Sequence, residues 1–322
     1  MDVVVTGASG HVGAALLRAL VARGDRVAAL VHRDARALEG LDVEPRRADV
    51  RDGGAVREAL RGAEVVYHAA AKLSLEAERD AETEATNVEG TRNVIAACRA
   101  HGVRRLVHFS SAHALRRDGS ALLAPGEGLP YERSKALAER EVLEAVERGL
   151  DAVIVSPCAV VGPFDFKPSY IGRVLLMLAK GMIPATVRGG QSWVDVRDIA
   201  ASSIAAGERG AAGSRFVLSG HWHTMQDFAR MASRVAEARP PLGAVPPWLA
   251  KAFAPMASAA TRAIGREPLF TRASIDALEP SPRPLDPGAR EALGHAPRPL
   301  VETLTDAYAF FEAQGWIERR RR

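Results

Sequence analysis

The sequence contains little cysteine. Cys98 and Cys158 are the two cysteines among 322 residues, and neither belongs to a Cys-x-x-Cys pair. Two cysteines are too few for a disulfide framework or a cysteine-rich zinc site. The stretch "HWH" at 221–223 has no further ligands at metal spacing, so we read it as loop and packing. We therefore expect no metal centre and a reducing, cytoplasmic environment.

Long apolar runs and a targeting segment are missing as well. The first residues, "MDVVVTGASG", contain neither the basic region nor the cleavage site of a secretory signal. No run reaches the roughly 18 uncharged apolar residues of a membrane span. Acidic and basic residues are interspersed and the net charge is +4, so no basic surface for nucleic acid is indicated. We expect no membrane span and a small-molecule partner.

Lysine is scarce in a chain with 43 basic residues and occurs at five positions, 72, 135, 167, 180 and 251. Lys135 closes the stretch "YERSK", four residues after Tyr131. Residues four apart lie on one helix face, with Cβ atoms about 6 Å apart. A neighbouring ammonium should lower the pKa of a phenol, which is ordinarily about 10. We predict that Tyr131 is the catalytic acid and base, and that Lys135 assists it and holds the ribose of a cofactor.

Short β-branched runs alternate with helical patterns in the first half of the chain. Strands are predicted at 2–6, 26–31, 43–49, 64–70, 105–111 and 151–157, and helices at 11–24, 53–62, 86–102 and 130–149. This alternation predicts an α/β fold with a Rossmann-type, doubly wound parallel sheet. The carboxyl ends of such strands meet at one crevice, where ligands bind.

The regular alternation ends near residue 158. Gly- and Pro-rich loops mixed with helical patterns then predict a smaller, mostly helical, substrate-binding cap. We expect residues 1–158 to form the dinucleotide-binding unit, rejoined by about 187–220. Residues 159–186 and 221–322 would form the cap.

A glycine-rich loop joins the first predicted strand to the first helix. "TGASGHVG" places Gly7, Gly10 and Gly13 three residues apart, where glycine permits close backbone approach and a helix N-terminus attracts a pyrophosphate. A tight turn with close helix packing is the alternative. We predict dinucleotide binding by this loop, with Ser9, His11 and Val12 also in contact with the cofactor.

The second predicted strand closes without the carboxylate that usually holds the ribose of NAD. His32 and Arg33 stand there instead, which favours the 2′-phosphate of NADP, although NAD stays open and Arg33 could simply be solvent-exposed. Asp49 and Val50 follow the third strand and are candidates for contact with the adenine. Three small residues after the fourth strand would form a wall beside the nicotinamide ribose: Ala69, Ala70 and Ala71.

Six motifs in order over about residues 1–220 resemble the extended branch of the short-chain dehydrogenase/reductase superfamily. They are "TGASGHVG", "NVEGTRNV", "HFSSAHAL", "YERSK", "SPCAVVGP" and "WVDVRDIA". The resemblance implies that Ser111 is the catalytic serine. It also implies that Asn87, Pro157 and Ala159 line the nicotinamide side, and that the chain forms a homodimer through helices 86–102 and 130–149. Dihydroflavonol 4-reductase and 3β-hydroxysteroid dehydrogenase relatives are the most similar members.

The expected activity is the interconversion of a ketone and a secondary alcohol on a bulky, largely apolar molecule. Apolar segments at 171–185 and 246–265 suggest a wall or lid that includes Trp248, Phe253 and Met256, although ordinary helix core explains them equally well. His113 could contact the substrate or simply pack.

The alternative activity is that of a sugar-nucleotide epimerase with tightly bound NAD. Dehydratases of this branch carry an Asp-Glu pair where this chain has Ala112 and His113, and epimerases commonly carry Tyr-Gly where it has Ala114 and Leu115. A non-catalytic, cofactor-binding regulator is disfavoured because Ser111, Tyr131 and Lys135 are all present.

Overall fold

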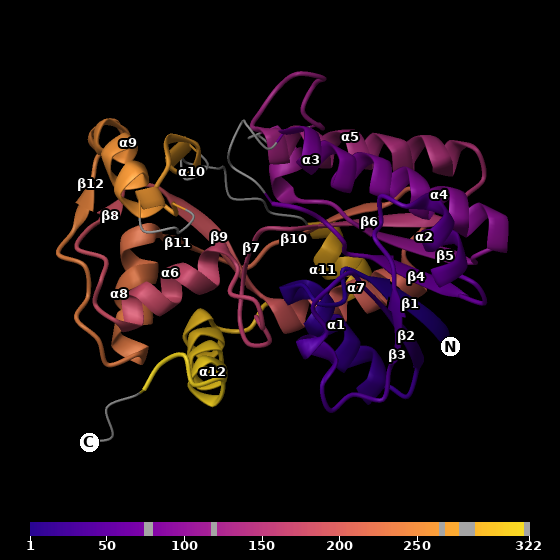
Figure 1. Cartoon of the computed structure of the whole chain (residues 1–322), viewed down its shortest axis with the longest axis horizontal. Coiled ribbons are helices and arrows are strands. Elements are labelled where there is room, and N and C mark those ends of the chain that lie inside the picture. Colours follow the sequence, from indigo (N-terminus) through magenta and orange to yellow (C-terminus); the bar gives the residue numbers. More distant parts are fainter. Residues whose placement is uncertain (74–79, 117–120, 264–267, 277–286, 319–322) are drawn as a thin grey trace.

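The computed structural model describes residues 1–73, 80–116, 121–263, 268–276 and 287–318, and shows two bodies side by side (Figure 1). The first is built on a seven-stranded parallel sheet with the order β10-β6-β5-β4-β1-β2-β3. Its strands are β1 (Asp2–Thr6), β2 (Arg26–Val31), β3 (Glu44–Arg47), β4 (Val65–His68), β5 (Arg105–Phe109), β6 (Ala152–Pro157) and β10 (Arg215–Leu218).

Helices cover both faces of this sheet (Figure 1). One face carries α1 (His11–Ala22), α7 (Val196–Arg209) and α11 (Pro287–Leu293), and the other carries α2 (Gly53–Ala59), α4 (Gly90–His101) and α5 (Pro130–Glu147). Successive strand residues enter opposite cores: Val3 and Val5 pack under α1, whereas Val4 packs under α2 and α4. Both faces are buried, which explains the uninterrupted apolar strands in the sequence. The predicted doubly wound, Rossmann-type sheet is confirmed.

The helix predicted at 86–102 differs most from the structure. It is divided into α3 (Asp80–Glu84), a π-helical turn (Ala85–Glu89) and α4. The widened turn is anchored by Asn87, whose partners lie far away in sequence, so local periodicity could not reveal it. The strands predicted at 43–49, 64–70 and 105–111 are each shorter at one or both ends. Short 3₁₀ turns occur at Arg36–Leu38 and Ala112–Ala114.

The second body is smaller and mostly helical. A three-stranded sheet has the order β11-β9-β7, and a two-stranded one pairs β12 with β8. Its elements are β7 (Ala159–Val161), α6 (Tyr170–Ala179), β8 (Thr186–Val187), β9 (Gly190–Asp195), β11 (His221–Thr224), α8 (Met225–Val235), β12 (Ala244–Val245), α9 (Pro247–Ala263), α10 (Arg272–Asp276) and α12 (Leu300–Ala313). Trp193 and Phe228 stack at its centre, with ring centroids 3.7 Å apart.

Two expectations about this half need correction. "HWH" lies in strand β11 rather than in a loop, because it pairs with β9. Residues 187–220 were expected to rejoin the first sheet. Strand β10 does join it, beside β6, and α7 packs on that sheet, but β9 belongs to the three-stranded sheet with β7 and β11. The division of the chain into a dinucleotide-binding unit and a cap stays a proposal.

None of the described helices is long and apolar enough to cross a membrane.

Candidate active site

The glycine-rich loop leaves β1 at the carboxyl edge of the first sheet. Gly7 has a φ of +68°, and a Cβ added to it would lie 2.5 Å from the backbone nitrogen of Ala70. A Cβ added to Gly13 would lie 2.2 Å from the carbonyl oxygen of Gly7. Any side chain at these positions would collide with backbone, so both need glycine. Tight packing of the turn alone would explain these two glycines.

The N-terminus of α1 indicates more than packing. Among the described residues no side chain caps this helix, whereas Asp52, Ser169 and Thr224 cap α2, α6 and α8. The first turn of α1 also contains no acidic residue. Uncapped N–H groups and the positive end of the helix dipole attract anions. The residues present therefore fit the pyrophosphate of a dinucleotide.

The acidic groups after β2 and β3 are already paired with arginine. Arg36 Nη2 donates to Asp34 Oδ2 at 2.6 Å, and Arg51 Nη2 donates to Asp49 Oδ2 at 2.6 Å. Hydrogen bonds from Arg51 outweigh partial burial and lower the pKa of Asp49 to about 2. Both carboxylates are therefore ionised and occupied by a neighbouring guanidinium.

Arg33 differs from these arginines. It is exposed, and no other described residue forms a hydrogen bond or ion pair with it. His32 is exposed beside it, with Nε2 3.7 Å from Asp49 Oδ2. The end of β2 thus presents the unpaired guanidinium of Arg33 and the imidazole of His32. The neighbouring carboxylates, Asp34 and Asp49, are each paired with an arginine.

Tyr131 and Ser111 lie where the start of α5 meets the end of β5. Pro130 occupies the first helical position of α5, where its missing N–H costs nothing, and Tyr131 follows it. The Ser111 hydroxyl is near enough to the Tyr131 phenol to oppose the rise in its pKa through hydrogen bonding. Ser110 instead donates a hydrogen bond to Glu139. Of the two serines, Ser111 is therefore the one that the structure brings to Tyr131.

Lys135 lies one turn after Tyr131 on the same helix face. It is 3% exposed, and its Nζ donates to the carbonyl oxygen of Phe109, the last residue of β5. Burial lowers the pKa of Lys135 to about 8, and the carboxylate of Glu139 opposes that fall. The ammonium is thus fixed beside the strand end, where its protonation changes in an accessible pH range.

The pKa of Tyr131 does not follow our prediction. Burial raises it, and the hydrogen bond with Ser111 opposes this rise only in part. Lys135 does not lower it, because its ammonium is directed at the carbonyl group of Phe109. The prediction that Lys135 lowers the pKa of Tyr131 is wrong for this arrangement of side chains.

Asn87 uses its amide group to hold two segments together. Its Oδ1 accepts from the backbone N–H of Lys72 at 2.7 Å, and its Nδ2 donates to the Lys72 carbonyl at 3.0 Å and to Ser134 Oγ at 2.8 Å. The side chain therefore joins the segment after β4 to the helix that carries Tyr131. A direct contact between Asn87 and a nicotinamide stays a prediction.

His113 lies beside the catalytic candidates. Its backbone N–H donates to Ser111 Oγ at 3.2 Å, and its Nδ1 lies 3.4 Å from Glu132 Oε1. Glu132 Oε2 also accepts from the backbone N–H of Leu129, which holds the carboxylate in place at the start of α5. The partly exposed imidazole is therefore oriented by a carboxylate next to Tyr131, a position that suits contact with substrate.

The other predicted cofactor residues lie at or soon after the ends of strands of the first sheet: Ser9, His11, Val12, Val50, Ala69, Ala70, Ala71, Pro157 and Ala159. His11 Nε2 lies 2.9 Å from the carbonyl oxygen of Pro163, so this ring already has a partner in the loop after β7. Val50 is buried, and its Cγ2 would be 2.9 Å from a Cβ on Gly90, so its side chain packs against α4.

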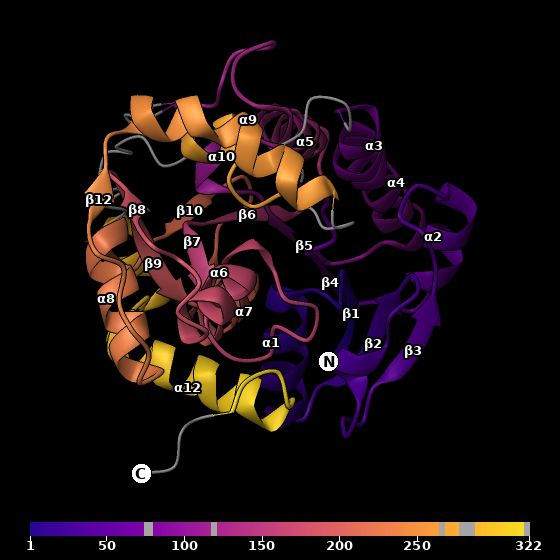
Figure 2. The same ribbon diagram turned by 60° about the vertical axis from the view of Figure 1, so that its left-hand side comes forward.

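Trp248 is not brought to these residues. It is 69% exposed on α9, and Phe253 and Met256 on the same helix are 56% and 66% exposed. Helix α10 lies beside α9 (Figures 1 and 2). The wall predicted from these three residues and the contact between Trp248 and substrate both stay predictions.

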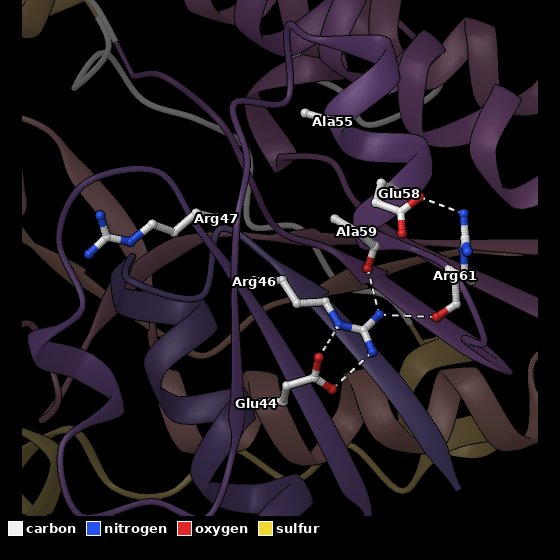
Figure 3. A pocket seen from close by; sticks show the side chains of 7 residues that line it. All are labelled: Glu44, Arg46, Arg47, Ala55, Glu58, Ala59 and Arg61. Carbon is white, nitrogen blue, oxygen red and sulfur yellow. Dashed lines mark hydrogen bonds and ion pairs between the residues drawn. The ribbon is translucent and has the colours of Figure 1, made fainter.

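A separate depression of about 440 Å³ lies between β3 and α2 (Figure 3). Arg46 crosses it and donates to Glu44 and to the carbonyl oxygens of Ala59 and Arg61, at 2.7–3.1 Å. Its guanidinium therefore satisfies the last carbonyl of α2 and the carbonyl of Arg61 just beyond the helix. We read this depression as structural.

Among the described residues no group of histidine, cysteine and carboxylate side chains could hold a metal ion.

Sequence reasoning missed Glu139 and Arg215. Glu139 is fully buried four residues after Lys135, and its Oε1 lies 2.7 Å from Arg215 Nε on β10. The spacing could have revealed Glu139, since Tyr131, Lys135 and Glu139 recur every fourth residue. Nothing local could have revealed Arg215, which lies far away in the sequence.

Comparisons with known proteins agree with this geometry. The model of the NAD dependent epimerase/dehydratase family matches residues 3–219. The chain is 38% identical to sterol demethylase protein B of Methylococcus capsulatus, over 98% of this chain and 100% of that protein. It is 31% identical to a putative dihydroflavonol 4-reductase of Synechocystis sp., over 98% of this chain and 95% of that protein. The crystal structure of gox2253 is similar with a TM-score of 0.84 and 33% identity, covering 98% of this chain and 99% of that one.

Proposed function

The chain belongs to the NAD-dependent epimerase/dehydratase family, in the extended branch of the short-chain dehydrogenases/reductases, and from that premise we propose that it interconverts a ketone and a secondary alcohol on a bulky, largely apolar molecule. It is an NAD(P)-dependent reductase or dehydrogenase. The observation that carries the proposal is the placement of Ser111, Tyr131 and Lys135 together at the carboxyl edge of the sheet.

The proton chemistry follows from the side chains. When bound, a nicotinamide cofactor supplies or accepts the hydride. Tyr131 would donate a proton to the carbonyl oxygen during reduction, and Ser111 would orient that oxygen through its hydroxyl. Because burial raises the pKa of Tyr131, the phenol is protonated at neutral pH and ready to act as the acid.

The apolar substrate class is supported by the names of the relatives. One relative is named for a sterol and another for a dihydroflavonol. We propose that His113, oriented by Glu132, contacts the polar group next to the reacting carbon, while apolar side chains cover the rest of the substrate.

NADP is the cofactor that we propose. A 2′-phosphate needs a cation that is not already neutralised, and Arg33 meets that condition. The nearby carboxylates that would repel the phosphate, Asp34 and Asp49, are each paired with an arginine two residues later. A preference for NADP over NAD follows from this charge pattern.

A side-by-side substrate panel tests the proposal. Apolar ring ketones of the steroid, flavonoid and terpenoid kind and UDP-, GDP- and dTDP-sugars are incubated with NADPH or NADH, and absorbance and products are followed. We expect consumption of NADPH with the apolar ketones and little with the sugars. Conversion of a sugar nucleotide without net cofactor consumption, by protein that purifies with NAD bound, would establish the epimerase alternative instead.

A further inference from the structure

Three side chains of helix α5 each contact a different residue at the end of β5. Three α5 residues spaced by four share one face, and each binds a different one of three consecutive residues at the end of β5. The pairs are Tyr131 with the Ser111 hydroxyl, Lys135 with the Phe109 carbonyl and Glu139 with the Ser110 hydroxyl. The first two pairs belong to the site described above. The third has no role in it.

Glu139 has a polar partner on each oxygen. It is 0% exposed, Ser110 donates a hydrogen bond to Oε2, and Arg215 Nε forms an ion pair with Oε1 at 2.7 Å without hydrogen-bond geometry. A buried carboxylate needs such partners to be stable. Arg215 opens β10, so the third pair also fastens the edge strand of the sheet to α5.

Glu139 lies one turn after Lys135 on the same helix face and, without a direct ion pair, stabilises its positive charge. Among the described residues, Glu139 is the carboxylate whose charge acts on Lys135. The other titratable groups nearby are His68 on β4 and His108 on β5, and both are buried and neutral at physiological pH. Arg140, the next residue of α5, also acts on Glu139, but its Nη2 donates to the Leu123 carbonyl.

We propose that Glu139 is a positioning residue of the reaction, which fixes the register of α5 on β5 and balances the buried charge of Lys135. This inference rests on the proposed role of Lys135 in holding the cofactor ribose. Loss of the Glu139 charge would leave an uncompensated ammonium in a buried site. Lys135 would then lose its proton at a lower pH, and cofactor binding would fail earlier on the alkaline side.

The test measures NADPH affinity between pH 6 and 10 by fluorescence, which requires no substrate. The variants are Glu139→Gln, Glu139→Asp, Arg215→Gln and Lys135→Ala. Glu144→Gln is the matched control, because Glu144 lies on the same helix but is exposed and paired with Arg148. Circular dichroism confirms that each variant is folded.

In the wild type, affinity should fall as the pH rises through the Lys135 pKa of about 8. Glu139→Gln should move this fall to lower pH by about one unit or more, and Glu139→Asp should restore part of the shift. Arg215→Gln should also move it to lower pH, because Arg215 lowers the pKa of Glu139 and its loss favours the uncharged carboxyl group. Damage of a purely structural kind would weaken binding at every pH without moving the pH at which affinity falls.

If NADPH affinity falls at the same pH in Glu139→Gln as in Glu144→Gln, the proposal is overturned. If Glu139→Gln does not fold, Arg215→Gln is the deciding variant. An unchanged pH of the fall in Arg215→Gln then overturns the proposal as well. If Lys135→Ala binds NADPH like the wild type at every pH, the proposed role of Lys135 itself is wrong. Failure of the substrate panel with these binding shifts intact would reject only the substrate assignment.

Discussion

Tyr131 illustrates how its surroundings determine the protonation state of a catalytic candidate. Burial raises the pKa of its phenol, and hydrogen bonding with Ser111 opposes that rise. A phenol with a raised pKa stays protonated at neutral pH, and the phenolate that would act as the base in the reverse reaction is correspondingly scarce. The alkaline behaviour of reduction should therefore be governed by Lys135, whose pKa of about 8 is the lower of the two.

Removal of the Tyr131 hydroxyl should abolish most turnover. We expect Tyr131→Phe to lower kcat by at least about 100-fold, the scale of a lost general acid, while the Kd for NADPH stays nearly unchanged. Steady-state kinetics and cofactor titration measure the two effects. Tyr308→Phe is the control, because its hydroxyl donates to the Leu175 carbonyl inside the second body. Near-normal turnover in Tyr131→Phe would exclude it as the acid.

The charge at Arg33 should decide cofactor choice. A charge-assisted hydrogen bond contributes about 1.5–3 kcal/mol, so Arg33→Ala should weaken NADPH binding by about 10-fold or more and leave NADH binding unchanged. Calorimetric titration of both cofactors measures this selectivity. Arg26→Ala serves as the control, because its 87% exposed side chain lies at the opposite end of the same strand. Equal losses for both cofactors would show that Arg33 does not bind the phosphate.

At the scale of secondary structure, β4 and β5 bury a histidine pair beneath the site. His68 and His108 are register partners with ring centroids 5.4 Å apart. His68 Nδ1 lies 2.7 Å from Thr6 Oγ1, whereas neither ring nitrogen of His108 has a partner among the described residues. Burial lowers the pKa of His68 to about 3 and lowers that of His108 well below its ordinary value.

This pair should make the fold sensitive to acid. Unfolded histidines take up protons near pH 6.5, whereas the buried rings stay neutral, so the stability that they contribute at neutral pH is lost as the pH falls below that value. The loss is about 1.4 kcal/mol per histidine and pH unit. Urea unfolding at pH 7.5 and 5.5 should show that His108→Leu loses less stability than the wild type. His221→Leu, at an exposed site, should lose as much as the wild type. Equal losses in both variants would contradict this account.

Helices and strands whose limits are set by neighbouring residues could be predicted from the sequence. Features that depend on contacts with residues far away in the sequence could not. Strands β1 and β2 match their predicted ranges because their buried runs are bounded by turn residues. The start of α5 was predictable from Pro130. The π-helical turn depends on the contacts of Asn87 with Lys72 and Ser134, which exist only after folding. Likewise the glycine loop and the Tyr-x-x-x-Lys spacing are visible in the sequence, whereas the pairing of Glu139 with a residue on β10 is not.

At the scale of the whole molecule, we propose that two copies associate through α4 and α5. The two helices lie side by side on one face of the sheet and are joined by an ion pair between Arg92 and Glu141 of 2.7 Å (Figure 1). Ala96 is exposed on α4, where a small residue permits close helix packing. Light scattering should give the mass of a dimer for the wild type and that of a monomer for Ala96→Glu. Ala309→Glu, exposed on α12, should stay dimeric, and a monomeric wild type would reject the proposal.

The position of β10 has a consequence for the order in which the protein can mature. Its strand completes the edge of a sheet whose other six strands are made before residue 158 leaves the ribosome, yet the guanidinium of Arg215 arrives much later. Until then, Glu139 in the nascent first half lacks its ion pair with Arg215. Domains usually fold as they emerge. Here α5 can form its contacts with the end of β5 early, and its tie to the edge strand is added only after the chain has passed residue 215.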